Sequence, residues 1–198
     1  MENKDRPSLD DLFHDLYNQN PNINRNACKD MLSFWPKESK LKLLENLKSE
    51  DITIRRKSII ALSSFGKEVV NSVVNLYLSS QQRLLQISCL KVLIKVAANN
   101  KLDEYTSSID KVIEGALNDY SVEITLGLVN LLRQLGNGAV PTLIEMAKDK
   151  DILRSKASIT ALGEISDPLS RSFLEEFSRK SDIDPIVKED IIISLEND

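Results

Sequence analysis

Histidine and cysteine, the side chains that most often carry nucleophilic catalysis or hold a transition metal, are rare in this sequence. It contains one histidine, His14, and two cysteines, Cys28 and Cys89. These residues are too few for a zinc site, which usually takes about four ligands. No nucleophile stands beside a general base in a recognisable pattern. We therefore predict no catalytic residues and no metal site.

The remaining residues of reactive type have structural explanations. Cys28 and Cys89 take the place that Ser58 and Ser158 take in the helical pattern described below, so we expect buried thiols of low reactivity. His14 falls on the polar side of a helical segment, which predicts a solvated or capping side chain. The glycines of residues 136–138 follow a helical pattern rather than a strand, so they predict a helix stop and not a phosphate loop.

A repeated phrase shows which elements must position any functional side chain. Ser-Ile-x-Ala-Leu occurs at residues 58–62 and again at 158–162. Around the first copy, small and apolar residues fall at i, i+4, i+7, i+8 and i+11, which is one face of a helix, and Gly66 then ends it. The same frame recurs about every thirty residues. Its six sets are Asn24, Cys28, Met31, Leu32 and Trp35; Ile54, Ser58, Ala61, Leu62 and Phe65; Leu85, Cys89, Val92, Leu93 and Val96; Ile124, Leu128, Leu131, Leu132 and Leu135; Ser158, Ala161, Leu162 and Ile165; and Val187, Ile191, Ser194 and Leu195.

A shorter amphipathic segment precedes each of these helices, and polar turn residues join the two. Helix pairs that repeat along a chain are typical of an α-solenoid, because each pair buries its apolar face only against its neighbours. We predict an all-α, HEAT-like superhelix of about six helix pairs in a single domain. The longer link at residues 99–108 is expected to extend one joint without a domain boundary. The repeats span approximately residues 8–36, 37–66, 67–100, 101–136, 137–166 and 167–198.

The composition is that of a soluble helical protein. With 41% hydrophobic and 28% charged residues, and only six glycines and six prolines, the chain has enough apolar side chains for a core and few loop formers. No apolar stretch reaches the roughly 20 residues of a membrane helix, and the start lacks an apolar signal core, so we expect a cytoplasmic protein without a membrane span. The net charge of −4 at pH 7 disfavours a nucleic-acid partner.

The best candidates for binding lie on the second helices, on the faces that are not required to form the core. Second helices of a solenoid usually line its concave side, and a mixture of cations and aliphatic side chains there could form a groove for a partner or for an apolar, anionic ligand. Alternatively, the aliphatic residues only extend the helix packing, and Arg55 and Arg56 bond the acidic turn near Asp51. Tyr105 and Tyr120 are candidates for stacking on a ligand. The predicted groove residues are Arg56, Ile60, Ile87, Lys91, Ile94, Leu126, Asn130, Arg133 and Lys156.

Four runs carry a resemblance to known proteins. They are SEDITIRRKSIIALSSFG at residues 49–66, SCLKVLIKVAANN at 88–100, GALNDYSVEITLGLVNLLRQLG at 115–136, and the segment 158–197. Through them the sequence resembles HEAT-repeat proteins of the E/F bilin lyase family, and within that family it is most similar to the short Z-type members that act in phycoerythrin maturation in cyanobacteria.

This resemblance implies a scaffold or chaperone-like subunit of a phycobilin lyase system that assists covalent bilin attachment to phycoerythrin subunits. It implies two partners, a phycoerythrin subunit and a larger E/F-type lyase. It also implies no permanently bound cofactor and a transiently held phycobilin, phycoerythrobilin. Whether the protein is an enzyme is left open, and the lack of a nucleophile–base pair favours a non-catalytic helper. The alternatives are a general HEAT-repeat protein–protein adaptor and, against the charge, a HEAT-fold DNA-binding protein.

Overall fold

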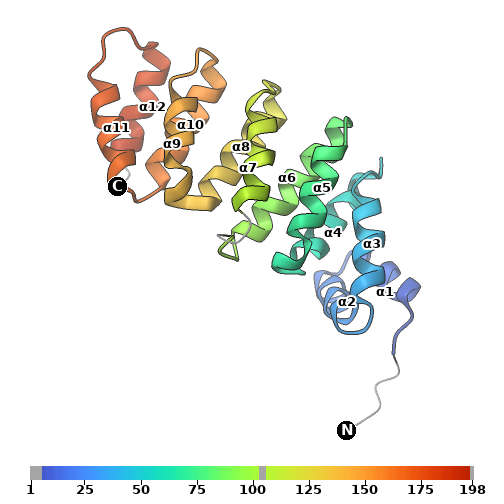
Figure 1. The fold of residues 1–198 in the computed structure, drawn as a ribbon. Coiled ribbons are helices and arrows are strands. Elements are labelled where there is room, and N and C mark those ends of the chain that lie inside the picture. The colour runs from blue at the N-terminus through green and yellow to red at the C-terminus, as the bar shows by residue number, and fades with distance from the viewer. Residues whose placement is uncertain (1–5, 103–105, 197–198) are drawn as a thin grey trace. The chain divides into compact units, whose positions relative to one another are not determined.

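All regular secondary structure in the described part of the chain is helical, which confirms the predicted all-α class (Figure 1). The computed structural model describes residues 6–102 and 106–196. The helices follow one another in pairs, as the repeated pattern predicts. The first helices of the pairs are α1 (Leu9–Leu16), α3 (Pro36–Asn46), α5 (Val70–Ser79), α7 (Thr106–Leu117), α9 (Val140–Ala147) and α11 (Pro168–Ser178). The second helices are α2 (Pro21–Phe34), α4 (Ile52–Ser63), α6 (Arg83–Ala97), α8 (Val122–Leu135), α10 (Ile152–Glu164) and α12 (Pro185–Glu196).

The helices form two compact units, residues 1–100 and residues 101–198. In the first unit, α1 packs against α2, α3 against α4, and α4 and α5 both against α6. In the second unit, α8, α9, α11 and α12 all pack against α10. Second helices therefore lie beside second helices in each unit, as in HEAT repeats. The boundary between the units falls in the long link at residues 99–108, and the single domain over residues 1–198 stays a prediction.

The predicted helical frame describes the core of each unit. Most of its positions are buried, and those with at most 1% exposure include Met31, Leu62, Leu93, Leu132 and Leu162. The exceptions are half-buried and lie toward the ends of second helices: Leu32, Trp35, Ile54, Leu135 and Leu195. Trp35 follows α2, where its Nε1 donates a hydrogen bond to the carbonyl of Pro7 and the guanidinium of Arg6 lies 3.5 Å from the ring centroid. The segment before α1 thus covers this indole.

Two glycines end helices through a backbone conformation that other residues rarely adopt. Gly66 follows α4 with a φ of 58°, and Gly136 follows α8 with a φ of 71°. A positive φ brings steric strain to an L-residue but not to glycine. Each glycine begins a short 3₁₀ helix, η1 (Gly66–Val69) or η3 (Gly136–Ala139), that leads into the next α-helix. The structure therefore confirms a helix stop at residues 136–138.

Candidate ligand-binding surface

His14 and the acidic residues offer no metal centre in the described ranges. No group of three or more histidine, cysteine, aspartate or glutamate side chains that could hold a metal ion occurs among residues 6–102 and 106–196. The side chain of His14 is 84% exposed, with Nδ1 3.6 Å from the carboxylate of Asp15. The imidazole is therefore solvated, as its place in the sequence predicts.

Both thiols are buried, as the helical frame predicts. Cys28 on α2 is 8% exposed and Cys89 on α6 is fully enclosed. Burial raises the pKa of both thiols, because a thiolate is poorly solvated inside a protein, and the pKa of Cys89 rises to about 12. The charge of Lys57 partly opposes this increase at Cys28. Neither thiol has the accessible, ionised form that nucleophilic chemistry requires.

Cys89 is expected to resist alkylation in the folded protein. Its pKa of about 12 keeps the thiol protonated near neutral pH, and only the thiolate attacks iodoacetamide. We expect labelling of Cys89 to be at least about a hundredfold slower in the native protein than in urea-unfolded protein. Mass spectrometry of the peptide that contains Cys89 measures both rates, and equal rates would show that the thiol is not enclosed.

Five of the predicted groove residues lie on α4 and α6, which pack against each other in the first unit. Arg56 and Lys91 are exposed, and Ile60 is 50% exposed. Ile87 and Ile94 are half-buried. We call these five residues the α4–α6 surface. It combines two cations with aliphatic side chains that reach solvent.

The cations of the α4–α6 surface are unpaired within the described residues. No hydrogen bond or ion pair there involves the side chain of Arg56 or Lys91. Arg55, by contrast, donates hydrogen bonds from Nη1 to the carbonyls of Ser49 and Glu50, in the turn before α4. The predicted bonding to this acidic turn is therefore confirmed for Arg55 and wrong for Arg56, because Arg56 is exposed and its side chain makes no hydrogen bond or ion pair with the described residues. The charges of Arg56 and Lys91 remain available to an external anion.

The other four predicted groove residues lie on α8 and α10 in the second unit: Leu126, Asn130, Arg133 and Lys156. Leu126 is 39% exposed, and the three polar residues are half-buried. The two cations already have carboxylate partners. Arg133 pairs with Glu164 and also donates to the side-chain oxygen of Asn130, and Lys156 Nζ lies 3.3 Å from Asp190. An anionic ligand would have to displace these carboxylates, which it need not do at the α4–α6 surface.

A pocket of about 120 Å³ lies between α10 and α12. Its lining residues are Thr160, Gly163, Glu164, Asp190, Ile193 and Ser194. Two of them, Glu164 and Asp190, are the carboxylate partners of Arg133 and Lys156. Because the charged groups that line this pocket are acidic, it does not suit a ligand that carries carboxylates.

Arg154 is a buried charge that is not among the residues predicted for a site. It occupies on α10 the position that Asn24, Ile54, Leu85 and Ile124 occupy on other second helices, and it is 3% exposed. Its guanidinium reaches from α10 to the end of α7 and the turn that follows it, where it contacts two backbone carbonyls. Nη1 donates to the carbonyl of Leu117 at 3.0 Å, and Nη2 donates to the carbonyl of Asp119 at 3.2 Å.

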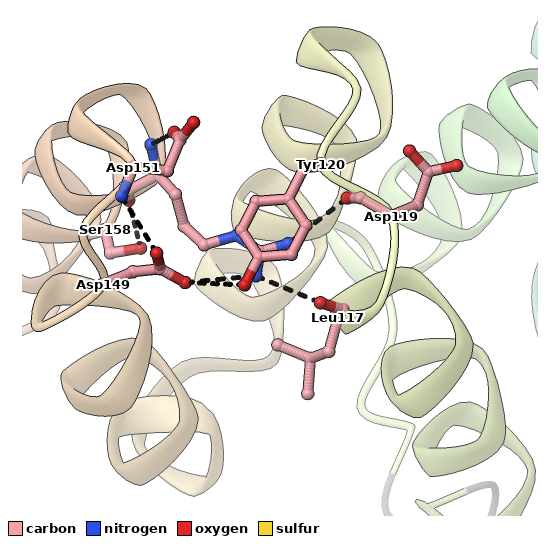
Figure 2. A network of polar contacts seen from close by, with 7 residues as sticks. Leu117, Asp119, Tyr120, Asp149, Asp151 and Ser158 are labelled. Atoms are coloured by element: carbon pink, nitrogen blue, oxygen red, sulfur yellow. Dashed lines mark hydrogen bonds and ion pairs between the residues drawn. The ribbon is translucent and has the colours of Figure 1, made fainter.

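Asp149 and Tyr120 complete this network. Arg154 Nη1 lies 3.4 Å from Asp149 Oδ2, and the hydroxyl of Tyr120 donates to the same oxygen at 3.2 Å (Figure 2). The guanidinium carbon lies 3.9 Å from the centroid of the Tyr120 ring. Burial opposes ionisation of Asp149, but hydrogen bonds from the Asp151 amide and Tyr120, with the charge of Arg154, outweigh it and hold the pKa below its ordinary value. The network fixes the end of α7 to α10.

Tyr120 therefore has a structural partner that the sequence analysis did not foresee. One face of its ring is occupied by Arg154, although 58% of the residue remains exposed. Stacking of a ligand on the other face stays a prediction. Tyr105, the second predicted stacking residue, lies outside the described residues.

Asn24 makes a similar connection in the first unit. Its Nδ2 donates to the carbonyls of Asp15, Leu16 and Asn18, at the end of α1. Its Oδ1 accepts a hydrogen bond from Lys57 on α4, in the next pair. At this position of the frame, Asn24 thus satisfies carbonyls at the end of the helix before it, whereas Arg154 satisfies carbonyls at and after the end of α7, in the pair before its own. Both Asn24 and Arg154 have an architectural function.

Helix pairs packed second helix beside second helix are typical of an α-solenoid, and residues 109–196 match a family model described as HEAT repeats. The bilin biosynthesis protein CpeZ of Synechococcus sp. (strain WH8020) is 23% identical over 175 residues, which cover 85% of this chain and 94% of that protein. The uncharacterized phycocyanin operon protein Z of Pseudanabaena tenuis (strain PCC 7409) is 24% identical over 138 residues, 70% of this chain and 68% of that protein. These relatives confirm the resemblance to Z-type bilin proteins.

Among solved structures, the complex of CpcE and CpcF of phycocyanin lyase from Nostoc sp. PCC7120 aligns with a TM-score of 0.48 and 14% identity. The alignment covers 99% of this chain and 77% of the matched chain. Within the residues that the structure describes, no helix has the length and apolar character to cross a membrane.

Proposed function

We propose that this protein is a chaperone-like subunit of a phycobilin lyase system and assists covalent attachment of a bilin to phycoerythrin subunits. The observation that carries the proposal is the similarity to CpeZ, which extends over 94% of that relative. The HEAT-repeat architecture is consistent with it, because stacked helix pairs offer extended surfaces that suit binding of a protein or a long ligand. The partners would be a phycoerythrin subunit and a larger E/F-type lyase.

The α4–α6 surface is where we place the bilin. An open-chain tetrapyrrole is an extended, largely apolar molecule with two propionate groups. Arg56 and Lys91 would bind the propionates through charge-assisted hydrogen bonds, and Ile60 would contact the rings. The second unit is less suited, because its cations Arg133 and Lys156 are neutralised by Glu164 and Asp190. Binding would be transient, with phycoerythrobilin as the expected ligand.

Covalent attachment of the bilin requires little chemistry from this chain. The thiol of an antenna cysteine adds across the ethylidene double bond of the bilin: the sulfur bonds to one carbon, the thiol proton ends on the other, and no oxidant is needed. The helper contributes by holding the bilin extended and near the subunit, which raises the effective concentration of the reacting groups. Neither buried cysteine of this chain takes part.

Charge reversal of the α4–α6 surface tests the ligand site. The double variant Arg56→Glu with Lys91→Glu is expected to weaken phycoerythrobilin binding by about tenfold or more, because two attractive contacts become repulsive. Binding is measured by the absorbance change of the bilin on titration with protein. The matched control is Lys37→Glu with Lys111→Glu, which changes two exposed lysines on α3 and α7 and gives the same net charge. Equal weakening in both double variants would argue against this site.

The proposed function has its own test. Covalent bilin on phycoerythrin subunits, and the soluble fraction of those subunits, are measured with and without this protein, in the presence and absence of the larger E/F-type lyase. We expect a higher yield of bilin adduct or more soluble subunit when the protein is present. If neither quantity changes under any condition, the proposal is wrong, and a general adaptor that binds unrelated proteins becomes the better explanation.

A further inference from the structure

The last helix of the second unit, α12, exposes an aliphatic residue at a position that is buried in the other second helices of this unit. The residue that directly follows the i+4 position of the frame is aliphatic in each second helix of this unit: Val129 on α8, Ile159 on α10 and Ile192 on α12. Val129 is 6% exposed and Ile159 is fully buried, since α10 packs on α8 and α12 packs on α10. Ile192 is 47% exposed. No helix in the described part of the chain covers the face of α12 that carries Ile192.

Ile192 points away from α10. The residues of α12 that face α10 are known from their contacts: Asp190 pairs with Lys156, and Ser194 lies against Gly163. At 3.6 residues per turn, Ile192 lies about 200° around the helix from Asp190. It therefore projects from the side on which a further second helix would pack. Leu195 flanks it and is only half-buried, whereas Leu132 and Leu162, at the same position of α8 and α10, are at most 1% exposed.

Charged residues on either side of Ile192 indicate what could cover it. Lys188 lies one turn before Ile192 and Glu196 lies one turn after it. Neither side chain has a hydrogen bond or ion pair within the part of the chain that the structure describes. If two copies of α12 pair antiparallel with Ile192 against Ile192, Lys188 of each copy comes opposite Glu196 of the other. The face is thus complementary to itself in both charge and hydrophobicity.

The helix pair formed by α1 and α2 offers no comparable face. None of the large hydrophobic residues of the first pair that the structure describes, in α1 and α2, is exposed, so α12 of one copy would find no apolar counterpart there. Head-to-tail stacking, which would build open chains of molecules, is disfavoured. Pairing of α12 with α12 is isologous and closes after two copies.

From these observations we infer that the face of α12 formed by Lys188, Ile192, Leu195 and Glu196 is a self-association surface that pairs two copies of this chain through antiparallel α12 helices. The contact involves one helix from each copy, so the dimer is a reversible one that forms with rising concentration. This interface is separate from the α4–α6 surface and needs neither a bilin nor a lyase partner.

Sedimentation equilibrium over a range of protein concentrations tests the interface. The unaltered chain is expected to show a monomer–dimer equilibrium, and Ile192→Asp is expected to raise its dissociation constant by at least about tenfold. The control is Leu41→Asp, which places the same charge at a still more exposed leucine on α3, 68% exposed, and should leave the equilibrium unchanged.

Charge exchange distinguishes specific pairing from unspecific hydrophobic association. Lys188→Glu alone and Glu196→Lys alone should each weaken the dimer, because like charges then face each other. The double variant Lys188→Glu with Glu196→Lys should restore it, because the exchanged pair is again complementary between identical copies. A monomer at all concentrations, or a dimer that none of these variants alters, would overturn the inference. A chain that stays monomeric alone but binds the lyase through Ile192 would show that the face serves a different protein.

Discussion

Replacing Arg154 with alanine is expected to destabilise the second unit by about 3 kcal/mol. The substitution leaves the carbonyls of Leu117 and Asp119 without their donor and removes the cation beside Asp149. Breaking a buried ion pair from one side usually costs about 3–5 kcal/mol, because the remaining charge is left uncompensated. The lower end of this range applies here, since the side chain of Asp149 is 21% exposed and water can reach it.

The measurement must report on the second unit. The single tryptophan, Trp35, lies in the first unit, so its fluorescence follows the wrong part of the chain. Amide hydrogen exchange of α8 and α10 monitors the second unit directly, and exchange in α2 and α4 serves as the internal control. We expect Arg154→Ala to accelerate exchange in α8 and α10 and to leave α2 and α4 unchanged. Equal protection of α8 and α10 in both proteins would show that the network contributes no stability.

A second variant and a change of pH separate the ion pair from the packing of the side chain. Arg154→Met keeps most of the aliphatic contacts and should cost nearly as much as alanine if the polar network dominates. The pKa of Asp149 is below its ordinary value of 3.8, so the carboxylate stabilises the fold above that pH, and this contribution is lost as the pH falls through the lowered pKa. The difference between the unaltered chain and Arg154→Met should therefore shrink below about pH 4.

The helical frame was predictable because it depends on residue type and spacing alone. The buried stripe of a helix is marked by small residues, such as Ser58 and Ser158, and by large ones, such as Leu62 and Leu162. The end of a helix is marked by a glycine, such as Gly66. Neither signal requires knowledge of a packing partner. Such local rules hold for each repeat in turn, and this is why the helix pairs were placed correctly.

The paired cations were not predictable in the same way. Arg133 and Lys156 look alike in sequence to Arg56 and Lys91, yet only the first two find carboxylates, Glu164 and Asp190, which lie on the next second helix some thirty residues away. Whether such an ion pair forms depends on how far two packed helices are shifted along their axes and rotated relative to each other. For Arg154 a signal did exist: an arginine in a position otherwise held by Ile, Leu, Val or Asn, after aspartates at 149 and 151, marks a buried polar contact.

The effect of a substitution at Gly163 on α10 also depends on how two helices pack. We expect the second large loss of stability there. A Cβ atom at this position would lie 2.6 Å from Ser194 Cβ and 3.1 Å from the Ser194 backbone on α12. In an exposed helix alanine is more stable than glycine by about 1 kcal/mol, but an added methyl in a packed contact usually costs about 1–3 kcal/mol. We expect Gly163→Ala to destabilise the second unit by about 2 kcal/mol, measured as the shift of its urea midpoint by hydrogen exchange.

Two further substitutions test whether the effect of Gly163→Ala arises from the contact between α10 and α12. Gly138→Ala is the matched control, because a Cβ there meets no atom within 4 Å, and it should change stability by less than about 0.5 kcal/mol. Ser194→Gly removes the atom that obstructs the new methyl, so the double variant should recover much of the loss even though glycine weakens α12. If Gly163→Ala instead stabilised the unit, α10 and α12 could not be in the close contact that sets the direction of Ile192.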